Sequence, residues 1–296
     1  MITFRYHVVT LVAVFLALGV GVLFGVSFID QSTVEGLKSA QTRLGARNET
    51  LRDRIVALET EAEAYRAYVS SSRDLIVRGA LRDHPVLILA FESTPVASVD
   101  AVVQTIQLAG ARVGGPVTLS DLLDLKTDEG RRRLSALLEL TTTDPRTLSD
   151  TLVAQLTAAV TGGDFGLLQR LVDGGLASGR PPSPAEGTQA APPGPARAVV
   201  IVGGESSREL NDRLALPLTR ALAGAPVLAA VVEAQSNSLN LVGPLRQAGD
   251  LNVVTVDGID TPLGQAALAA GLRAGFDGQF GNYGLGPGAT SALPAG

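Results

Sequence analysis

An uncharged run near the N-terminus constrains this chain more than any other feature of its sequence. From Val8 to Ile29 there are 22 residues without a charge, and Asp30 ends the run. At about 1.5 Å rise per residue, a helix of this length crosses the ~30 Å hydrocarbon core of a bilayer. We therefore predict that residues 1–30 form an N-terminal membrane anchor.

A cleaved signal peptide is the alternative for this segment. The apolar part of a signal peptide usually has about 7–15 residues and ends at a small-x-small site. The run here is longer and stays apolar to its end, although Ala17-Leu18-Gly19 could be cut. Arg5 lies before the run, while Asp30 and Glu35 follow it, so the positive-inside rule favours a cytoplasmic N-terminus and a body on the exported side of the envelope.

Small residues recur every four positions inside this run. They form one stripe on a helix, and such stripes let two helices approach closely in lipid. Because Ala and Gly are also common in membrane helices, the stripe alone is a weak signal for pairing. The predicted membrane dimer face consists of Ala13, Ala17, Gly21 and Gly25.

A heptad repeat follows the anchor and predicts a coiled-coil stem over residues 31–74. Leucine dominates the d positions, and Val or Ile fills several a positions, a pattern typical of parallel dimers. Asn48 at an a position fits too, because a buried Asn pair fixes the register. The predicted coiled-coil core is Val34, Leu37, Leu44, Asn48, Leu51, Ile55, Leu58, Ala62, Tyr65 and Val69, with Gln41 at the remaining a position.

Charges beside this core favour a parallel homodimer in its membrane-distal half. Arg54 faces Glu59 of a second copy and Glu61 faces Arg66, whereas Arg47 and Arg52 repel each other. A single amphipathic helix folded back on the rest of the chain is the alternative. The strict 3.5-residue repeat favours the coiled coil, since a helix on a globular core shows a broader apolar face.

The remaining sequence predicts an α/β domain over residues 75–279. Apolar runs of strand length alternate with helical patterns, which indicates a mostly parallel sheet with helices on both faces. Gly114-Gly115-Pro116 is expected to interrupt the second strand. Residues 178–197 are rich in Pro and Gly and predict a flexible loop, and residues 280–296 form a Gly-rich tail that we expect to be irregular.

An acidic residue lies at or just beyond the carboxyl end of each clear strand. In a parallel sheet these positions converge on the edge where α/β proteins bind ligands, and carboxylates there suit a hard cation or a cationic ligand. Capping of the following helices is the simpler interpretation, since acidic and small polar residues are expected at strand-to-helix turns. The candidate ligand edge consists of Glu92, Glu205, Glu233 and Asp257.

Other catalytic or binding motifs are weak. Gly203-Gly204 could bring backbone N–H groups to a phosphate, but a tight turn closed by a Ser206–Glu209 capping box is the preferred interpretation. His84 precedes a strand and so lies at the wrong edge for a hydrolase site. The chain has no Cys, which excludes a thiolate nucleophile. Its net charge of −5 gives no reason to expect nucleic acid as a partner. We predict that the protein is not an enzyme.

The opening residues carry a family resemblance. Phe4-Arg5-Tyr6-His7-Val8-Val9, continued by Val12 to Gly21, is similar to the N-terminus of the MctB family of actinobacterial envelope proteins, usually called copper transporters. The order of anchor, coil, α/β body and Gly-rich tail with Tyr283-Gly284 resembles that family too. The resemblance implies a single-span, dimeric cell-envelope protein of copper homeostasis or export, with copper implied by the resemblance only.

The metal ligands of such a role are not evident in the sequence. Copper(I) prefers thiolate and thioether ligands and copper(II) prefers imidazole, but the chain has no Cys, a single Met and two His. The metal site therefore stays unassigned. The alternative function is a non-enzymatic envelope scaffold, working through coiled-coil and α/β-domain contacts with an envelope protein partner in cell-envelope growth or division.

Overall fold

The computed structural model describes residues 3–27, 31–182, 195–235, 241–249 and 251–295. The chain forms two compact units, residues 1–65 and 66–296. The domain boundaries predicted from the sequence stay predictions. Part of the predicted flexible loop, residues 183–194, lies outside the described residues.

The first unit is helical. Helix α1 spans Thr3–Ser27, and helix α2 begins at Gln31 and runs without a break to Val77. Within α1, residues Tyr6–Gly25 are long and apolar enough to cross a membrane. Helix α2 reaches into the second unit, because its residues from Arg66 onward belong there.

The second unit is built on a seven-stranded sheet with the order β3-β2-β1-β4-β5-β6-β7. All neighbouring strands are parallel except β2 and β3, which are antiparallel. The predicted α/β class with a mostly parallel sheet is thus confirmed. The strands are β1 (Pro85–Phe91), β2 (Arg112–Leu119), β3 (Ala177–Gly179), β4 (Ala198–Val202), β5 (Leu228–Glu233), β6 (Val253–Asp257) and β7 (Asn282–Tyr283).

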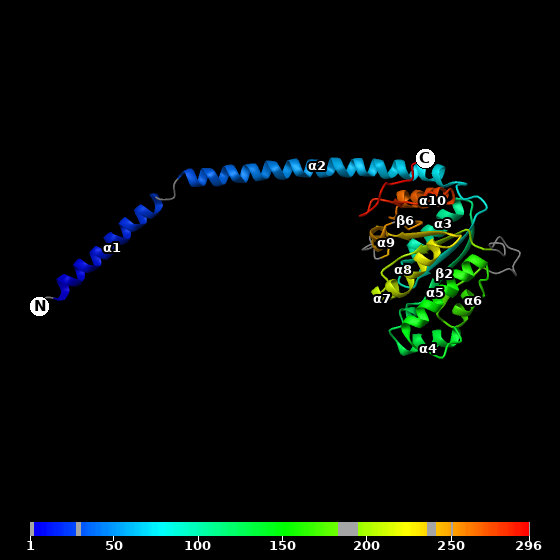
Figure 1. Cartoon of the computed structure of the whole chain (residues 1–296). Helices are drawn as coiled ribbons and strands as arrows, with labels where there is room; N and C mark the ends of the chain where they lie inside the picture. Colours follow the sequence, from blue (N-terminus) through cyan, green and yellow to red (C-terminus); the bar gives the residue numbers. More distant parts are fainter. Residues whose placement is uncertain (1–2, 28–30, 183–194, 236–240, 250, 296) are drawn as a thin grey trace. The chain divides into compact units, whose positions relative to one another are not determined.

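Helices cover both faces of this sheet, as Figure 1 shows. Because successive strand residues point to opposite faces, β1 contributes Leu87, Leu89 and Phe91 to one core and Val86, Ile88 and Ala90 to the other. The helical elements are α3 (Val96–Leu108), η1 (Asp121–Asp124), α4 (Asp128–Leu137), α5 (Pro145–Gly162), α6 (Gly166–Asp173), α7 (Arg208–Leu210), the π-helical turn η2 (Asn211–Ala215), α8 (Leu216–Ala223), α9 (Val242–Ala248) and α10 (Pro262–Phe276).

One core contains residues of α5, α6, α8 and α9, and the other contains residues of α3 and α10. Val77, at the end of α2, is fully buried in the second core. Arg73 Nη1 also donates a hydrogen bond to Gln265 Oε1 of α10, at 2.7 Å. The end of α2 is therefore fixed on the α/β body by both apolar and polar contacts.

Two expectations about strands are only partly right. Strand β2 continues through Gly114-Gly115-Pro116. Leu87 of β1 pairs with Gly114 and Leu89 pairs with Val117, so β2 has one residue more than β1 over this stretch and the register shifts there. The tail is also more regular than expected, since Asn282–Tyr283 forms β7 beside β6. Such short edge strands depend on pairing with a neighbour and leave little pattern in the sequence.

Candidate functional site

The apolar heptad positions of α2 are exposed in the single chain. Their side chains are 50% to 70% exposed, whereas Ala62 and Val69 are less exposed and Val34 lies outside the described side chains. Water-exposed leucines at four successive d positions are costly unless another surface covers them. The exposed members are Leu37, Leu44, Leu51, Ile55, Leu58 and Tyr65, which we call the α2 seam.

The small-residue stripe of α1 is also uncovered. Ala13, Ala17, Gly21 and Gly25 are all exposed, and a Cβ atom placed on Gly21 or Gly25 would meet no described atom within 4 Å. Nothing in the described part of the chain therefore occupies the close-approach surface that this stripe offers. Its role as a membrane dimer face stays a prediction.

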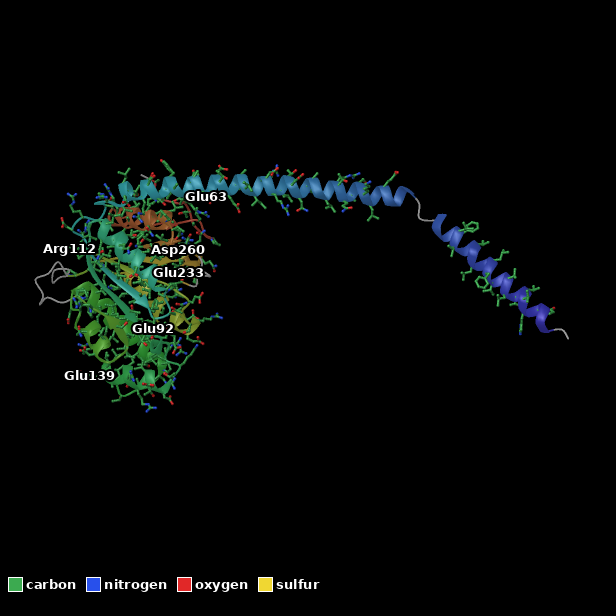
Figure 2. All side chains as sticks on the ribbon, turned by 180° about the vertical axis from the view of Figure 1, so that it is seen from behind. Glu63, Glu92, Arg112, Glu139, Glu233 and Asp260 are labelled. Carbon is green, nitrogen blue, oxygen red and sulfur yellow. The ribbon has the colours of Figure 1, made fainter. Side chains whose placement is uncertain are left out.

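The carboxyl edge of the sheet holds the four predicted acidic residues on neighbouring strands or the turns after them. Figure 2 shows Glu92 and Glu233 along this edge and Arg112 at the opposite one. Glu233 and Asp257 are direct neighbours in the β5–β6 ladder. Glu92 is exposed and accepts hydrogen bonds from Ser120 Oγ and from the backbone N–H of Asp121, while Glu205 is exposed in the turn after β4.

Glu233 is fully buried and binds the start of α9. Its two carboxylate oxygens accept hydrogen bonds from the backbone N–H groups of Leu241 at 3.0 Å and Val242 at 2.9 Å. Burial raises the pKa of Glu233, and the hydrogen bonds from Val242 and Leu241 partly oppose that shift. In this structure the carboxylate therefore fills the position at the helix N-terminus where an external anion would otherwise bind.

Asp257 forms a buried ion pair with Arg246 of α9. Arg246 Nη1 lies 2.8 Å from Asp257 Oδ2, and both side chains are 2% exposed. Asp257 Oδ2 has no hydrogen-bond partner among the described residues and is held by this ion pair, while Oδ1 accepts hydrogen bonds from the backbone N–H groups of Leu285 and Gly286. The carboxylate thus binds the Gly-rich tail to the edge of the sheet.

Arg246 holds the same tail from the other side, and sequence reasoning missed it. Its guanidinium donates to Thr255 Oγ1 and to the backbone carbonyls of Tyr283 and Pro287. The only available signal was a single Arg in the short apolar helix α9. Gly284 has a φ of +125°, and its missing Cβ lets the tail approach the Asp257 carboxylate. We call Arg246, Asp257 and residues 283–287 the tail clamp.

The turns after β1 and β4 close on each other. Between these strands the chain order of the sheet reverses, and ligands commonly bind at such a point in α/β folds. Here Thr94 Oγ1 donates to the carbonyl of Val202, and a Cβ atom on Gly204 would lie 2.6 Å from Thr94 Cα. The missing side chain of Gly204 therefore allows the backbones of the two turns to lie close together.

The predicted Ser206–Glu209 capping box is wrong. Ser207 caps α7 by accepting from the backbone N–H of Leu210, whereas the Ser206 hydroxyl lies 2.9 Å from the hydroxyl of Ser93. Glu209 forms an exposed ion pair with Lys126 at 2.8 Å. Ser206 thus links the two turns, and tertiary contacts decide which serine caps the helix.

His84 lies at the amino edge of the sheet and stacks on Phe276. Their ring centroids are 4.2 Å apart, and the guanidinium of Arg197 lies 5.6 Å from the centre of the same Phe276 ring. Burial lowers the pKa of His84 below its ordinary value of 6.5, and the positive charge of Arg197 lowers it further. The neutral imidazole is therefore the form that the folded body favours.

This pKa shift predicts a pH-dependent stability. Because the folded-state pKa of His84 is depressed, its contribution is complete above about pH 6.5 and is lost as the pH falls through the folded pKa. Urea midpoints of residues 66–296 should thus fall more between about pH 7.5 and pH 5 in the wild type than in His84→Gln. Equal falls would show that His84 does not titrate as the structure implies.

Metal-binding side chains do not cluster in the described part of the chain. No group of three or more His, Cys, Asp or Glu residues there is arranged to hold a metal ion. The buried carboxylates that lie closest to one another, Glu233 and Asp257, are both engaged by protein groups. The cation-binding edge predicted from the sequence stays a prediction.

The apolar N-terminal helix and the sheet domain that follows α2 define a class of protein: an α/β protein with one candidate membrane anchor among the residues that the structure describes. The chain belongs to the family described as "Copper transport outer membrane protein, MctB", whose match covers residues 1–294 and so includes anchor, α2, body and tail. No curated protein matches the chain. The family description concerns copper transport and membrane location and names no reaction.

Proposed function

We propose that the chain is a single-span, homodimeric envelope protein that acts in copper homeostasis or export through assembly and partner contacts. The observation that carries this proposal is the α2 seam, a row of exposed apolar side chains at heptad spacing. Membership in a family described by copper transport supports the link to copper. The exported side of the envelope is the proposed place of the body.

Pairing of two α2 helices covers the seam with complementary groups. In a parallel pair, Leu51 and Leu58 of one chain pack against the same residues of the second copy. The facing charges Arg54–Glu59 and Glu61–Arg66 attract each other across the pair. A common anchor favours the parallel orientation, because both helices start from the same membrane.

Copper enters this proposal as cargo of an assembly. The soft and imidazole ligands that copper prefers are almost absent from the chain, and His84 is stacked on Phe276. A partner protein, or residues contributed by both copies, would therefore supply most of the ligands. The chain itself would position that partner at the membrane.

A deletion strain tests the copper role. We expect that removal of the gene changes copper tolerance, and that the purified full chain alone retains no copper at micromolar concentration. Normal copper tolerance together with absent copper binding would overturn the copper role. The second candidate function, a scaffold in envelope growth or division, would then be supported if the same strain showed altered cell shape or septation.

A further inference from the structure

We propose that the second copy which pairs along α2 also packs on an exposed apolar patch where this helix joins the body. The patch consists of the exposed Tyr68, Leu75 and Ile76 around the half-buried Ser72, and we call it the junction patch. This inference rests on the proposed dimer and extends its interface from the coil to the α/β body. A second copy of this chain is the occupant.

The three apolar side chains of the junction patch are exposed, and the patch lies on one side of α2. Its residues are three, four or one apart in α2, so they share one side of the helix. Leu75 is 83% exposed, Tyr68 is 69% exposed and Ile76 is 40% exposed. The chain has only four tyrosines, and an exposed Tyr beside aliphatic residues has the composition of an interface centre.

The neighbouring side of α2 is already used by the chain itself. Val77 is buried in the core with α3 and α10, and Arg73 binds Gln265. These contacts fix the rotation of α2 about its axis, so the helix cannot rotate to bury the junction patch against the body. Covering it requires another surface.

The heptad positions of α2 continue into the junction patch. Ser72 is the d position after Tyr65, Ile76 is the a position after Val69, and Leu75 is the g position beside it. In a parallel coiled coil an a residue packs against the a and g residues of its partner, so Ile76 would contact Ile76 and Leu75 of the second copy. The attractive Glu61–Arg66 pair directs the partner helix toward this segment.

The surface beside the patch has room for such a partner. A hollow of about 400 Å³ borders Ile76 and is also lined by Ala80 and by Ala270 and Arg273 of α10. The side chain of Leu75 from a second copy would cover its mouth. Apolar atoms would then leave water on both chains at once.

Disulfide trapping tests this interface, and the absence of Cys makes each introduced thiol unique. We would oxidise the full chain in detergent with Leu51→Cys in the coil, Ser72→Cys at the centre of the junction patch, or Leu285→Cys on an exposed site of the tail. Paired d positions lie within disulfide reach. Leu51→Cys and Ser72→Cys should both cross-link at least about tenfold faster than Leu285→Cys.

The outcomes separate the two proposals. If Leu51→Cys cross-linked rapidly but Ser72→Cys cross-linked as slowly as Leu285→Cys, the junction interface would be overturned. The coiled-coil dimer would still be supported. Slow cross-linking of all three variants would overturn both.

A matched pair of substitutions gives a second readout. Leu75 and Leu285 are both largely exposed, so neither Leu75→Arg nor Leu285→Arg should disturb the fold. Leu75→Arg should weaken dimerisation at least about tenfold relative to Leu285→Arg, because it replaces an apolar side chain that would pack on Ile76 of the second copy with a charge that must lose water there. Equal dimer affinities would contradict the proposal.

Discussion

Asp257→Asn is expected to destabilise the α/β body by about 3–5 kcal/mol, the usual cost of leaving one member of a buried ion pair uncompensated. The substitution keeps the shape of the side chain but removes the charge that faces Arg246 at 2.8 Å. The guanidinium would then stay buried beside neutral groups. Urea unfolding of residues 66–296, which contain both cores, measures the effect.

A second ion pair provides the control for this prediction. Lys126 and Glu209 are also 2.8 Å apart, but both side chains are about half exposed. Glu209→Gln should therefore leave the urea midpoint unchanged, because water screens the charge that remains. Equal midpoints for Asp257→Asn and the wild type would show that the tail clamp does not stabilise the body.

Replacing both members of the buried pair separates charge from packing. Arg246→Met combined with Asp257→Leu removes both charges together. The body of this double variant should therefore be less destabilised than the body of the Asp257→Asn variant. The tail would still lose the hydrogen bonds that Arg246 donates to Tyr283 and Pro287. Faster hydrogen exchange confined to residues 282–291 of the double variant would report that loss.

Leu51→Asp is expected to separate the dimer, lowering its affinity by about 100-fold or more. The substitution would place two carboxylates against each other at a d position in the centre of the α2 seam, where desolvation and like charge both oppose association. Leu51 is already exposed in the single chain, so the helix and the body should remain folded. Light scattering of the purified full chain in detergent measures the change, and combining the variant with Asn48→Asp should strengthen it.

Val56 supplies a matched control on the same helix. It is apolar and 60% exposed, like the seam residues, but it occupies a b position on the outer side of the predicted coiled coil. Val56→Asp should leave the mass of the dimer unchanged. If Leu51→Asp and Val56→Asp behaved alike, the heptad interpretation of α2 would be wrong.

The central strands could be predicted because both of their faces are buried. β1 and β4 are continuous apolar runs of strand length, and this pattern leaves few alternatives once helices flank it. β3 and β7 have only three and two residues, and they form because a neighbouring strand offers hydrogen bonds. In both cases the neighbouring strand is far away in sequence, so no local sequence pattern predicts the short strand.

The position of the acidic residues could be predicted, but not the contacts they make. Strand ends fix where Glu233 and Asp257 lie, whereas the start of α9 and the tail determine which groups reach them. Arg246 has no distinctive sequence context, since its role depends on a tail about 40 residues further along the chain. Long-range contacts of this kind need the structure.

The α2 seam shows the opposite case. The heptad pattern is strong in the sequence and the structure describes the helix, but no described residue of the chain covers the seam. Sequence pattern and exposure together support a second copy as the covering molecule, because Arg54–Glu59 and Glu61–Arg66 attract each other across a parallel pair.

The molar mass of the full chain in detergent, measured by light scattering with and without added copper, tests the central claim most directly. We expect the protein mass of a dimer of the 30.5 kDa chain, unchanged by copper. A monomer under both conditions would contradict the paired α2 helices. A monomer that assembles only with copper would contradict the account too, since a metal site between chains would then hold the assembly together.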